Sequence, residues 1–238
     1  MSKIVKAAKN ALRAAGFSAP IKKWLMANMV EGSFHTLSPD LLVGLVKAFD
    51  LQKDFKDRAY YEFGLYQGFS IWFAEQIARG RVPKDFEFYG FDSFEGLPPS
   101  EVDGRFYKAG QLATDYQMVR DNLTKYGADW QRLKLFKGFY SAQEFARLAK
   151  TERFPPVAIA VIDVDIYESC VIVLEFLKPR LVPGSILILD DYNDMDRSDD
   201  HGERKAVREF NAKTGMELEP LFELGRECAG FRVVKAPR

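Results

Sequence analysis

Two pairs of aspartates come directly after apolar runs in the second half of the chain. Asp163 and Asp165 follow "VAIAVI", and Asp190 and Asp191 follow "SILIL". Short apolar runs of this kind favour buried strands, where an unpaired charge is costly. The interval from Asp163 to Asp190 is 190 − 163 = 27 residues, which is one strand-helix-strand step. The spacing therefore predicts that these aspartates meet at neighbouring strand ends.

Carboxylates gathered at one sheet edge repel one another, so each favours binding a proton or a cation. A hard divalent cation such as Mg²⁺ takes oxygen ligands and removes the repulsion. We predict a metal site formed by Asp163, Asp190 and Asp191. Asp165 and Glu168 have another explanation, because they stand where the next helix begins and acidic side chains stabilise helix N-termini. We assign these two residues to structure.

The segment "YYEFGLYQGFS" predicts a strand that ends in Glu62 and Gly64, with Gly68 before a helix that begins near Ser70. Ligands of parallel sheets bind beyond the carboxyl ends of the strands, and glycine lets a ligand approach the backbone. The spacing is G-x-x-x-G, not the G-x-G-x-x-G of a pyrophosphate site. The acidic residue before Gly64 favours a cationic or hydroxyl-rich ligand, although glycines in such turns are often only structural.

Asp92 closes the next predicted strand, 92 − 64 = 28 residues after Gly64. An acidic residue about this far along is placed to accept the hydroxyls of a ribose. The alternative is that Asp92 or Ser93 caps the following turn. Together, the glycine turn and Asp92 indicate an adenosine-type ligand.

His201 lies in the acidic stretch "MDRSDDHGERKAVREF" that follows the last aspartate pair. Histidine has the intrinsic pKa that suits a general base. An exposed loop histidine or a helix-cap residue is the alternative interpretation.

The wider pattern predicts a helical N-terminal addition over residues 1–50 and an α/β domain over residues 51–238. In the addition, Ser38 is the expected N-cap of a helix with Pro39 in its first turn. The domain alternates short apolar runs with helical stretches, which indicates βαβ units in a mostly parallel sheet. The last two runs leave no room for a helix and predict an antiparallel hairpin around Gly225. The stretch from Pro98 to Thr114 has the length of a functional lid.

Composition excludes several classes of partner. The 238 residues contain 34 Lys plus Arg and 34 Asp plus Glu, without a single-sign block that would indicate nucleic acid or a membrane surface. Cys170 and Cys228 are the two cysteines, too few for a disulfide framework. We expect a soluble, cytoplasmic protein that acts on a small molecule.

The motifs "YEFGLYQGFS", "FDSFEGLP", "GFY", "IDVDIYES" and "LDDYND", in this order, resemble the macrocin O-methyltransferase family over about residues 58–234. The resemblance implies an α/β, Rossmann-like class I methyltransferase fold. Its seven-stranded sheet would carry an antiparallel last strand, helices on both faces and an N-terminal helical addition. It also implies S-adenosylmethionine as cofactor, a homo-oligomer, and a divalent metal, usually Mg²⁺, on Asp163, Asp190 and Asp191.

The resemblance also assigns the cofactor contacts along the first three strand ends. They are Glu62, Gly64, Gly68, Ser70, Asp92, Ser93, Phe94, Gly138, Phe139 and Tyr140. Asp163 and His201 are the catalytic candidates.

We expect an O-methyltransferase acting on a vicinal hydroxyl of a sugar or glycosylated natural product. Three alternatives stay open: a catechol-type acceptor, a non-catalytic module that binds the cofactor, and a nicotinamide-dependent oxidoreductase, which the missing G-x-G-x-x-G disfavours.

Overall fold

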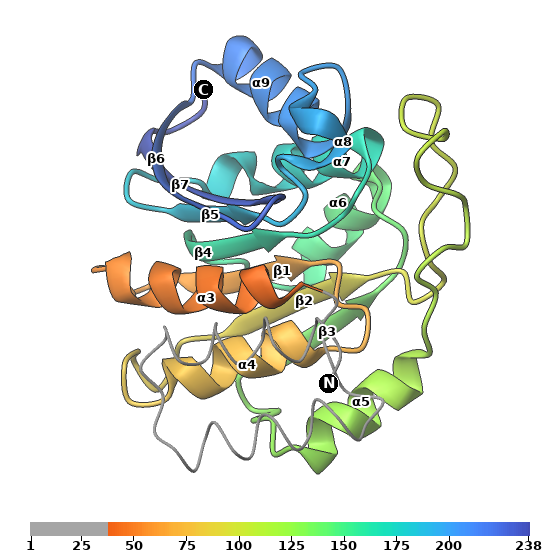
Figure 1. Cartoon of the computed structure of the whole chain (residues 1–238). Helices are drawn as coiled ribbons and strands as arrows, with labels where there is room; N and C mark the ends of the chain where they lie inside the picture. The colour runs from red at the N-terminus through yellow and green to blue at the C-terminus, as the bar shows by residue number, and fades with distance from the viewer. Residues whose placement is uncertain (1–37) are drawn as a thin grey trace.

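The computed structural model describes residues 38–238, which form a seven-stranded sheet in the order β3-β2-β1-β4-β5-β7-β6 (Figure 1). Strands β1 to β5 are parallel, and β7 runs antiparallel to its neighbours β5 and β6. The strands are β1 (Ala59–Phe63), β2 (Phe88–Asp92), β3 (Leu133–Lys137), β4 (Val157–Ile162), β5 (Ile186–Leu189), β6 (Glu217–Leu224) and β7 (Cys228–Lys235). The predicted strands, the terminal hairpin and the fold class are confirmed.

Helices cover both faces of the sheet. One core contains residues of α3 (Pro39–Leu51), α4 (Phe69–Ala78) and α5 (Tyr116–Lys125), and the other contains residues of α6 (Ala142–Thr151), α7 (Tyr167–Leu177) and α9 (Gly202–Thr214). Two short helical segments, η1 (Lys178–Arg180) and α8 (Asp194–Arg197), complete the described elements. None of the helices between residues 38 and 238 combines the length and apolar character that a bilayer crossing requires.

The central strands are apolar on both faces because helices lie on both. In β1, Tyr60 belongs to one core and Tyr61 to the other, and both side chains are fully buried. All six residues of β4 are buried as well. This explains why the strands read as continuous apolar runs without polar alternation.

Helix α3 begins as the sequence predicts. Ser38 is its N-cap, and the Ser38 hydroxyl accepts a hydrogen bond from the Leu41 amide at 3.2 Å. The helix is not set apart from the sheet, since its buried face, including Leu45 and Phe49, belongs to the first core. From residue 38 onward the predicted N-terminal addition is therefore packed as one layer of the sheet domain. Residues 1–37 of that addition lie outside the described residues.

The ends of β1 and β4 approach each other closely at Gly64. Its φ is +84°, and a β-carbon there would lie 1.7 Å from the Asp163 carbonyl oxygen. The Asp163 amide donates to the Phe63 carbonyl at 2.9 Å, which fixes the approach. A side chain at position 64 would therefore force the two strand ends apart.

Replacing Gly64 with alanine should therefore lower the free energy of unfolding by more than the cost of placing alanine in a left-handed conformation. Gly80 is the matched control, because its φ is +76° and nothing lies within 4 Å of its added β-carbon. We expect Gly80→Ala to cost about 1–2 kcal/mol, and Gly64→Ala to cost at least about 2 kcal/mol more. Urea unfolding of both variants measures the difference. Equal losses would contradict the role given to the Asp163 contact.

Candidate active site

A cavity lies at the carboxyl ends of the parallel strands, where the chain passes from each strand to the following loop. Ten of the predicted residues line it: Gly64, Ser70, Asp92, Ser93, Gly138, Phe139, Tyr140, Asp163, Asp190 and Asp191. The cavity is also lined by Asp40, Asp165 and Glu227, so seven carboxylates face it and, among the described residues, no Lys, Arg or His side chain does. Glu62, Gly68, Phe94 and His201 do not line the cavity.

Glu62 lies beneath the cavity in the core of the protein. Its carboxylate is fully buried and accepts hydrogen bonds from the Ser70 hydroxyl at 2.5 Å and from the Tyr60 hydroxyl. Burial raises the pKa of Glu62 to about 7, although the hydrogen bonds from Ser70 and Tyr60 oppose the rise. In this structure Glu62 links β1 to the first turn of α4 and does not line the cavity, and its expected contact with the cofactor stays a prediction.

Gly68 and Phe94 shape the loops and do not reach the cavity. Gly68 is the N-cap of α4 with φ +81°, and a β-carbon there would lie 2.9 Å from the Val119 side chain. Phe94 is 3% exposed and packs edge-on against the ring of Tyr116. Both residues support the turns that carry the cavity wall.

Asp92 organises the glycine turn. Its carboxylate accepts hydrogen bonds from the amides of Leu65 at 2.7 Å, Tyr66 at 3.1 Å and Phe94 at 2.6 Å. A carboxylate has about four acceptor positions, so about one remains for a ligand hydroxyl. The capping alternative is therefore correct for Asp92, and ribose binding stays a prediction.

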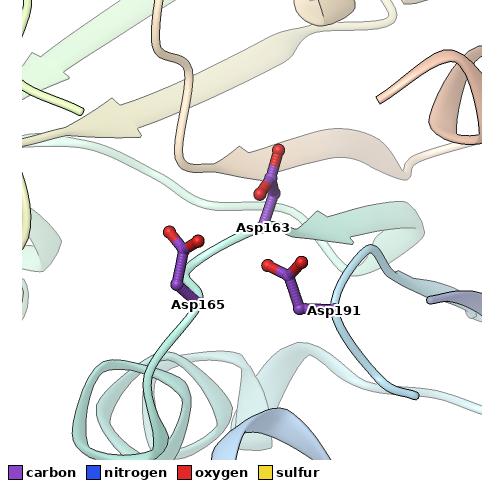
Figure 2. Close-up of side chains that lie close together, drawn as sticks. All are labelled: Asp163, Asp165 and Asp191. Atoms are coloured by element: carbon purple, nitrogen blue, oxygen red, sulfur yellow. The ribbon is translucent and has the colours of Figure 1, made fainter. Parts of the chain in front are cut away.

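The carboxylates of Asp163, Asp165 and Asp191 face one another across the ends of β4 and β5 (Figure 2). One oxygen from each lies within 4.8 Å of the others, which is a spacing that a metal ion can bridge. The Asp191 Oδ2 atom is buried and has no hydrogen-bond partner. We call these three residues the aspartate trio. Their oxygen-only chemistry and the unpartnered Asp191 oxygen fit a hard divalent cation.

Burial and mutual repulsion set the protonation of the trio. Loss of solvation raises the pKa of Asp163 and of Asp191 well above the ordinary carboxylate range, and neighbouring carboxylates raise both further. The same causes raise the pKa of Asp165 to about 7. A divalent cation would reverse this effect, because it stabilises the charged forms.

Asp165 corrects the prediction made from sequence. The N-cap of α7 is Ile166, and no side-chain cap bond forms there. The Tyr167 amide in the first turn instead donates to the Asp103 carboxylate at 2.7 Å. Asp165 has φ +59° between Val164 and Ile166, whose carbonyl and amide are joined by a 2.6 Å hydrogen bond. This tight turn is rare and strained, and it turns the Asp165 carboxylate toward Asp163 and Asp191.

Asp190 lies outside the trio in this structure, and its predicted role as a metal ligand stays a prediction. It lines the cavity, but its carboxylate accepts a 2.7 Å hydrogen bond from the Ser38 hydroxyl and is not part of the trio. Successive residues at a strand end point to opposite sides. Asp191 therefore reaches the trio, while Asp190 faces the start of α3. Burial raises the pKa of Asp190 to about 6.

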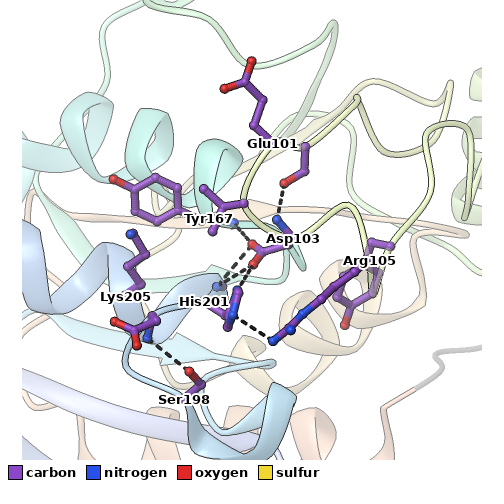
Figure 3. Close-up of polar contacts among 12 residues, drawn as sticks. Glu101, Asp103, Arg105, Tyr167, Ser198, His201 and Lys205 are labelled. Atoms are coloured by element: carbon purple, nitrogen blue, oxygen red, sulfur yellow. Dashed lines mark hydrogen bonds and ion pairs between the residues drawn. The ribbon is translucent and has the colours of Figure 1, made fainter.

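The loop from Pro98 to Thr114 is anchored by two carboxylates. Glu168 accepts hydrogen bonds from the Ser100 hydroxyl at 2.7 Å and from the amides of Glu101 and Val102. Asp103 is fully buried and accepts from the Tyr167 and Gly202 amides, at the starts of α7 and α9 (Figure 3). Glu168 does lie in the first turn of α7, as predicted.

His201 is engaged by this loop and does not face the cavity. Its Nδ1 atom lies 2.9 Å from Asp103 Oδ1, and its Nε2 atom lies 3.0 Å from Arg105 Nη2 (Figure 3). Because arginine can only donate, Nε2 is the acceptor and Nδ1 donates to Asp103. Both ring nitrogens are occupied, so the structure does not place His201 as the predicted general base. It is the N-cap residue of α9, which agrees with the alternative interpretation.

The strand order, with one antiparallel strand next to the edge, and the cavity at the strand ends define a class I methyltransferase fold. Residues 52–233 match the model of the macrocin O-methyltransferase (TylF) family. The chain therefore belongs to that family, which confirms the resemblance seen in its motifs.

The chain is also similar to two curated relatives, both named as O-methyltransferases. The chain is 30% identical over 171 residues to 8-demethyl-8-(2,3-dimethoxy-alpha-L-rhamnosyl)-tetracenomycin-C 4'-O-methyltransferase of Streptomyces olivaceus, covering 68% of this chain and 61% of that one. It is 27% identical over 181 residues to mycinamicin III 3''-O-methyltransferase of Micromonospora griseorubida, covering 72% and 66%. The match thus spans less than two thirds of each relative.

Solved structures show the same fold. The O-methyltransferase NovP superposes with a TM-score of 0.72 at 20% identity, over 86% of this chain and 84% of NovP. The calicheamicin methyltransferase CalS11 superposes with a TM-score of 0.67 at 21% identity, over 98% and 93%.

The raised carboxylate pKa values predict how stability depends on pH and Mg²⁺. A carboxylate whose pKa rises on folding binds its proton more tightly in the folded state, so its contribution is present at low pH and is lost as pH rises through the folded value. For Asp165 that range runs from 3.8 to about 7. Without divalent cations, the melting temperature should therefore fall between about pH 4 and pH 8. A fixed Mg²⁺ concentration of about 100 times the Kd at pH 8 should restore about 2.7 kcal/mol at pH 8. The same concentration should restore less at pH 5, where protons compete for the carboxylates.

Asp191→Asn is the control, since it should remove most of the Mg²⁺ effect while the fold persists. A wild-type protein whose melting temperature ignores Mg²⁺ at pH 8 would contradict a metal site at the trio. Calorimetric scanning measures both proteins.

Proposed function

We propose that this protein is an S-adenosylmethionine-dependent O-methyltransferase that methylates a vicinal hydroxyl of a sugar in a glycosylated natural product, assisted by a divalent cation. The observation that carries the proposal is the contact between Gly64 and the Asp163 carbonyl. It joins the glycine turn expected to bind the cofactor to the aspartate trio within one cavity. Methyl donor and hydroxyl acceptor would therefore meet side by side.

The cavity suits the proposed cofactor in its charge. A sulfonium and an amino group are cationic, and the lining carries carboxylates without a described basic side chain. Phe139 lines the cavity and is 44% exposed, which leaves an aromatic ring available to stack on adenine. These features support S-adenosylmethionine over a dinucleotide, whose pyrophosphate would be repelled.

The aspartate trio is the proposed metal site, with Asp163, Asp165 and Asp191 as its ligands. A divalent cation held there would orient two adjacent hydroxyls and lower the pKa of the attacking one. Two features hold the carboxylates in place: the strained turn at Asp165, and the hydrogen bond from the Asp163 amide to the Phe63 carbonyl of β1. Alignment of the acceptor with the methyl group accounts for much of the rate in such in-line transfers.

A sugar acceptor is proposed because the two curated relatives are named as enzymes of sugar-bearing natural products. A homo-oligomer and a cytoplasmic location stay predictions, which sedimentation and cell fractionation test.

The acceptor class can be tested with purified protein, labelled S-adenosylmethionine and Mg²⁺. A rhamnosylated aromatic or macrolide with adjacent free hydroxyls should accept the methyl group, and the matching monodeoxy glycoside should not. Methylation of catechol in preference to every glycoside would favour the catechol alternative. Binding of S-adenosylhomocysteine without transfer to any diol would favour the non-catalytic module.

Asp191→Asn should lower kcat/KM by about 100-fold or more, because the trio would lose a ligand. Its affinity for S-adenosylhomocysteine should stay near that of the wild type, since the glycine turn is untouched. Steady-state kinetics and titration calorimetry separate the two effects. Unchanged turnover in this variant would contradict metal assistance.

His201→Gln should reduce kcat by less than about 10-fold, because both ring nitrogens serve the loop and not the cavity. Loss of a general base typically costs about 10²–10⁴ in rate. A loss in that range, with the pH-rate profile flattened on its acidic side, would restore the base role first considered for His201.

A further inference from the structure

Glu203 is a fully buried carboxylate in the first turn of α9. It does not line the cavity. Its two oxygens accept hydrogen bonds from two backbone amides, Val164 at 3.4 Å and Asp191 at 3.2 Å. Among the described contacts, no cation pairs with it. Burying a carboxylate without a cation is costly. The reason that Glu203 is buried therefore lies with the two amides that it binds.

The two amides belong to the segments that carry the aspartate trio. Val164 lies between Asp163 and Asp165, and the second amide is that of Asp191 itself. The β4–β5 ladder ends at the pairing of Ile162 with Leu189 and the bond from the Asp190 amide to the Ile162 carbonyl. Glu203 thus links the segments that follow β4 and β5, just beyond the last hydrogen bond of the ladder between those strands.

We propose that Glu203 is a positioning residue for the aspartate trio: it fixes the distance between the β4 and β5 strand ends and so the geometry that a divalent cation meets. The inference rests on the proposed metal role of the trio. Glu203 acts through Val164 and Asp191 and does not touch the ion itself.

Only a carboxylate of this length fits the task. Both partners are N–H donors, so both side-chain oxygens must accept. Glutamine offers one oxygen and one NH₂ group, and the NH₂ group would face an amide hydrogen. Aspartate keeps both oxygens at the same separation but is one methylene shorter, so its carboxylate would fall short of the two amides from the same helix position.

Helix α9 is itself fixed on its other side. The amide of Gly202, next to Glu203, donates to Asp103 at 3.2–3.3 Å. The first turn of α9 is therefore held between the loop anchored by Asp103 and the strand ends held by Glu203. Because the first turn of α9 is fixed on both sides, the Glu203 carboxylate cannot shift with the Val164 segment or with the Asp191 segment alone.

The test compares Mg²⁺ binding in Glu203→Gln, Glu203→Asp and wild type by titration calorimetry, with S-adenosylhomocysteine titrated in parallel. We expect both variants to bind Mg²⁺ about 10–100-fold more weakly, as when outer partners of metal ligands are removed. Their affinity for S-adenosylhomocysteine should be unchanged. Glu203→Asp decides the question in case the glutamine variant does not fold.

Glu75→Gln is the matched control. Glu75 is also fully buried, but it pairs with Arg79 at 3.1 Å and Arg132 at 3.2 Å and does not line the cavity. It should lose stability and keep its Mg²⁺ affinity. Wild-type Mg²⁺ affinity in the Glu203 variants, or an equal loss in Glu75→Gln, would overturn the positioning role.

The two proposals fail in different ways. If wild type and Asp191→Asn bind Mg²⁺ equally, or neither binds it, the metal site itself is wrong. If Asp191→Asn loses Mg²⁺ and the Glu203 variants do not, only the positioning role is wrong.

Discussion

Repulsion among buried carboxylates is the constraint on which the rest of this structure depends. The parallel sheet delivers Asp163, Asp165, Asp190 and Asp191 to one edge, where little water remains to screen them. The surrounding elements relieve part of the repulsion: Ser38 donates to Asp190, and backbone amides donate to Glu203. The buried Asp191 oxygen stays without a partner. The repulsion that remains is therefore concentrated at the aspartate trio, where a bound cation would neutralise it.

The sheet could be predicted from sequence because its determinants are local. Each strand is an apolar run that both cores bury, and each crossover is long enough for one helix. The N-cap at Ser38 was readable for the same reason, since the capping residue and the capped amide are three positions apart. The gathering of aspartates at one edge followed from the topology alone.

The roles within the aspartate group could not be predicted in the same way. Asp165 was expected to start α7, but Asp103, which lies 64 positions before Tyr167, accepts the hydrogen bond from the Tyr167 amide there. His201 has the chemistry of a base, yet the same Asp103 and Arg105 occupy its nitrogens. Glu203 gave no sequence signal, because its burial depends on where α9 meets the strand ends. In each case a partner distant in sequence decided the outcome.

The loop that carries Asp103 contacts the starts of two helices and also contacts carboxylates beside the cavity. Its fixed points are Asp103 at the two helix starts and the backbone bonds that join Leu97 with Gly110 and Gln111. Residues 104–109 lie between these points. Among them, Tyr107 donates a hydrogen bond to the Asp194 carboxylate at 2.6 Å and also contacts Asp165 of the trio. A substitution of Tyr107 would therefore disturb the carboxylates, and a substitution of Arg105 would remove a contact of His201. One short loop thus links the starts of α7 and α9 to the carboxylates beside the cavity, so a shift of this loop would reach both helices and the trio together.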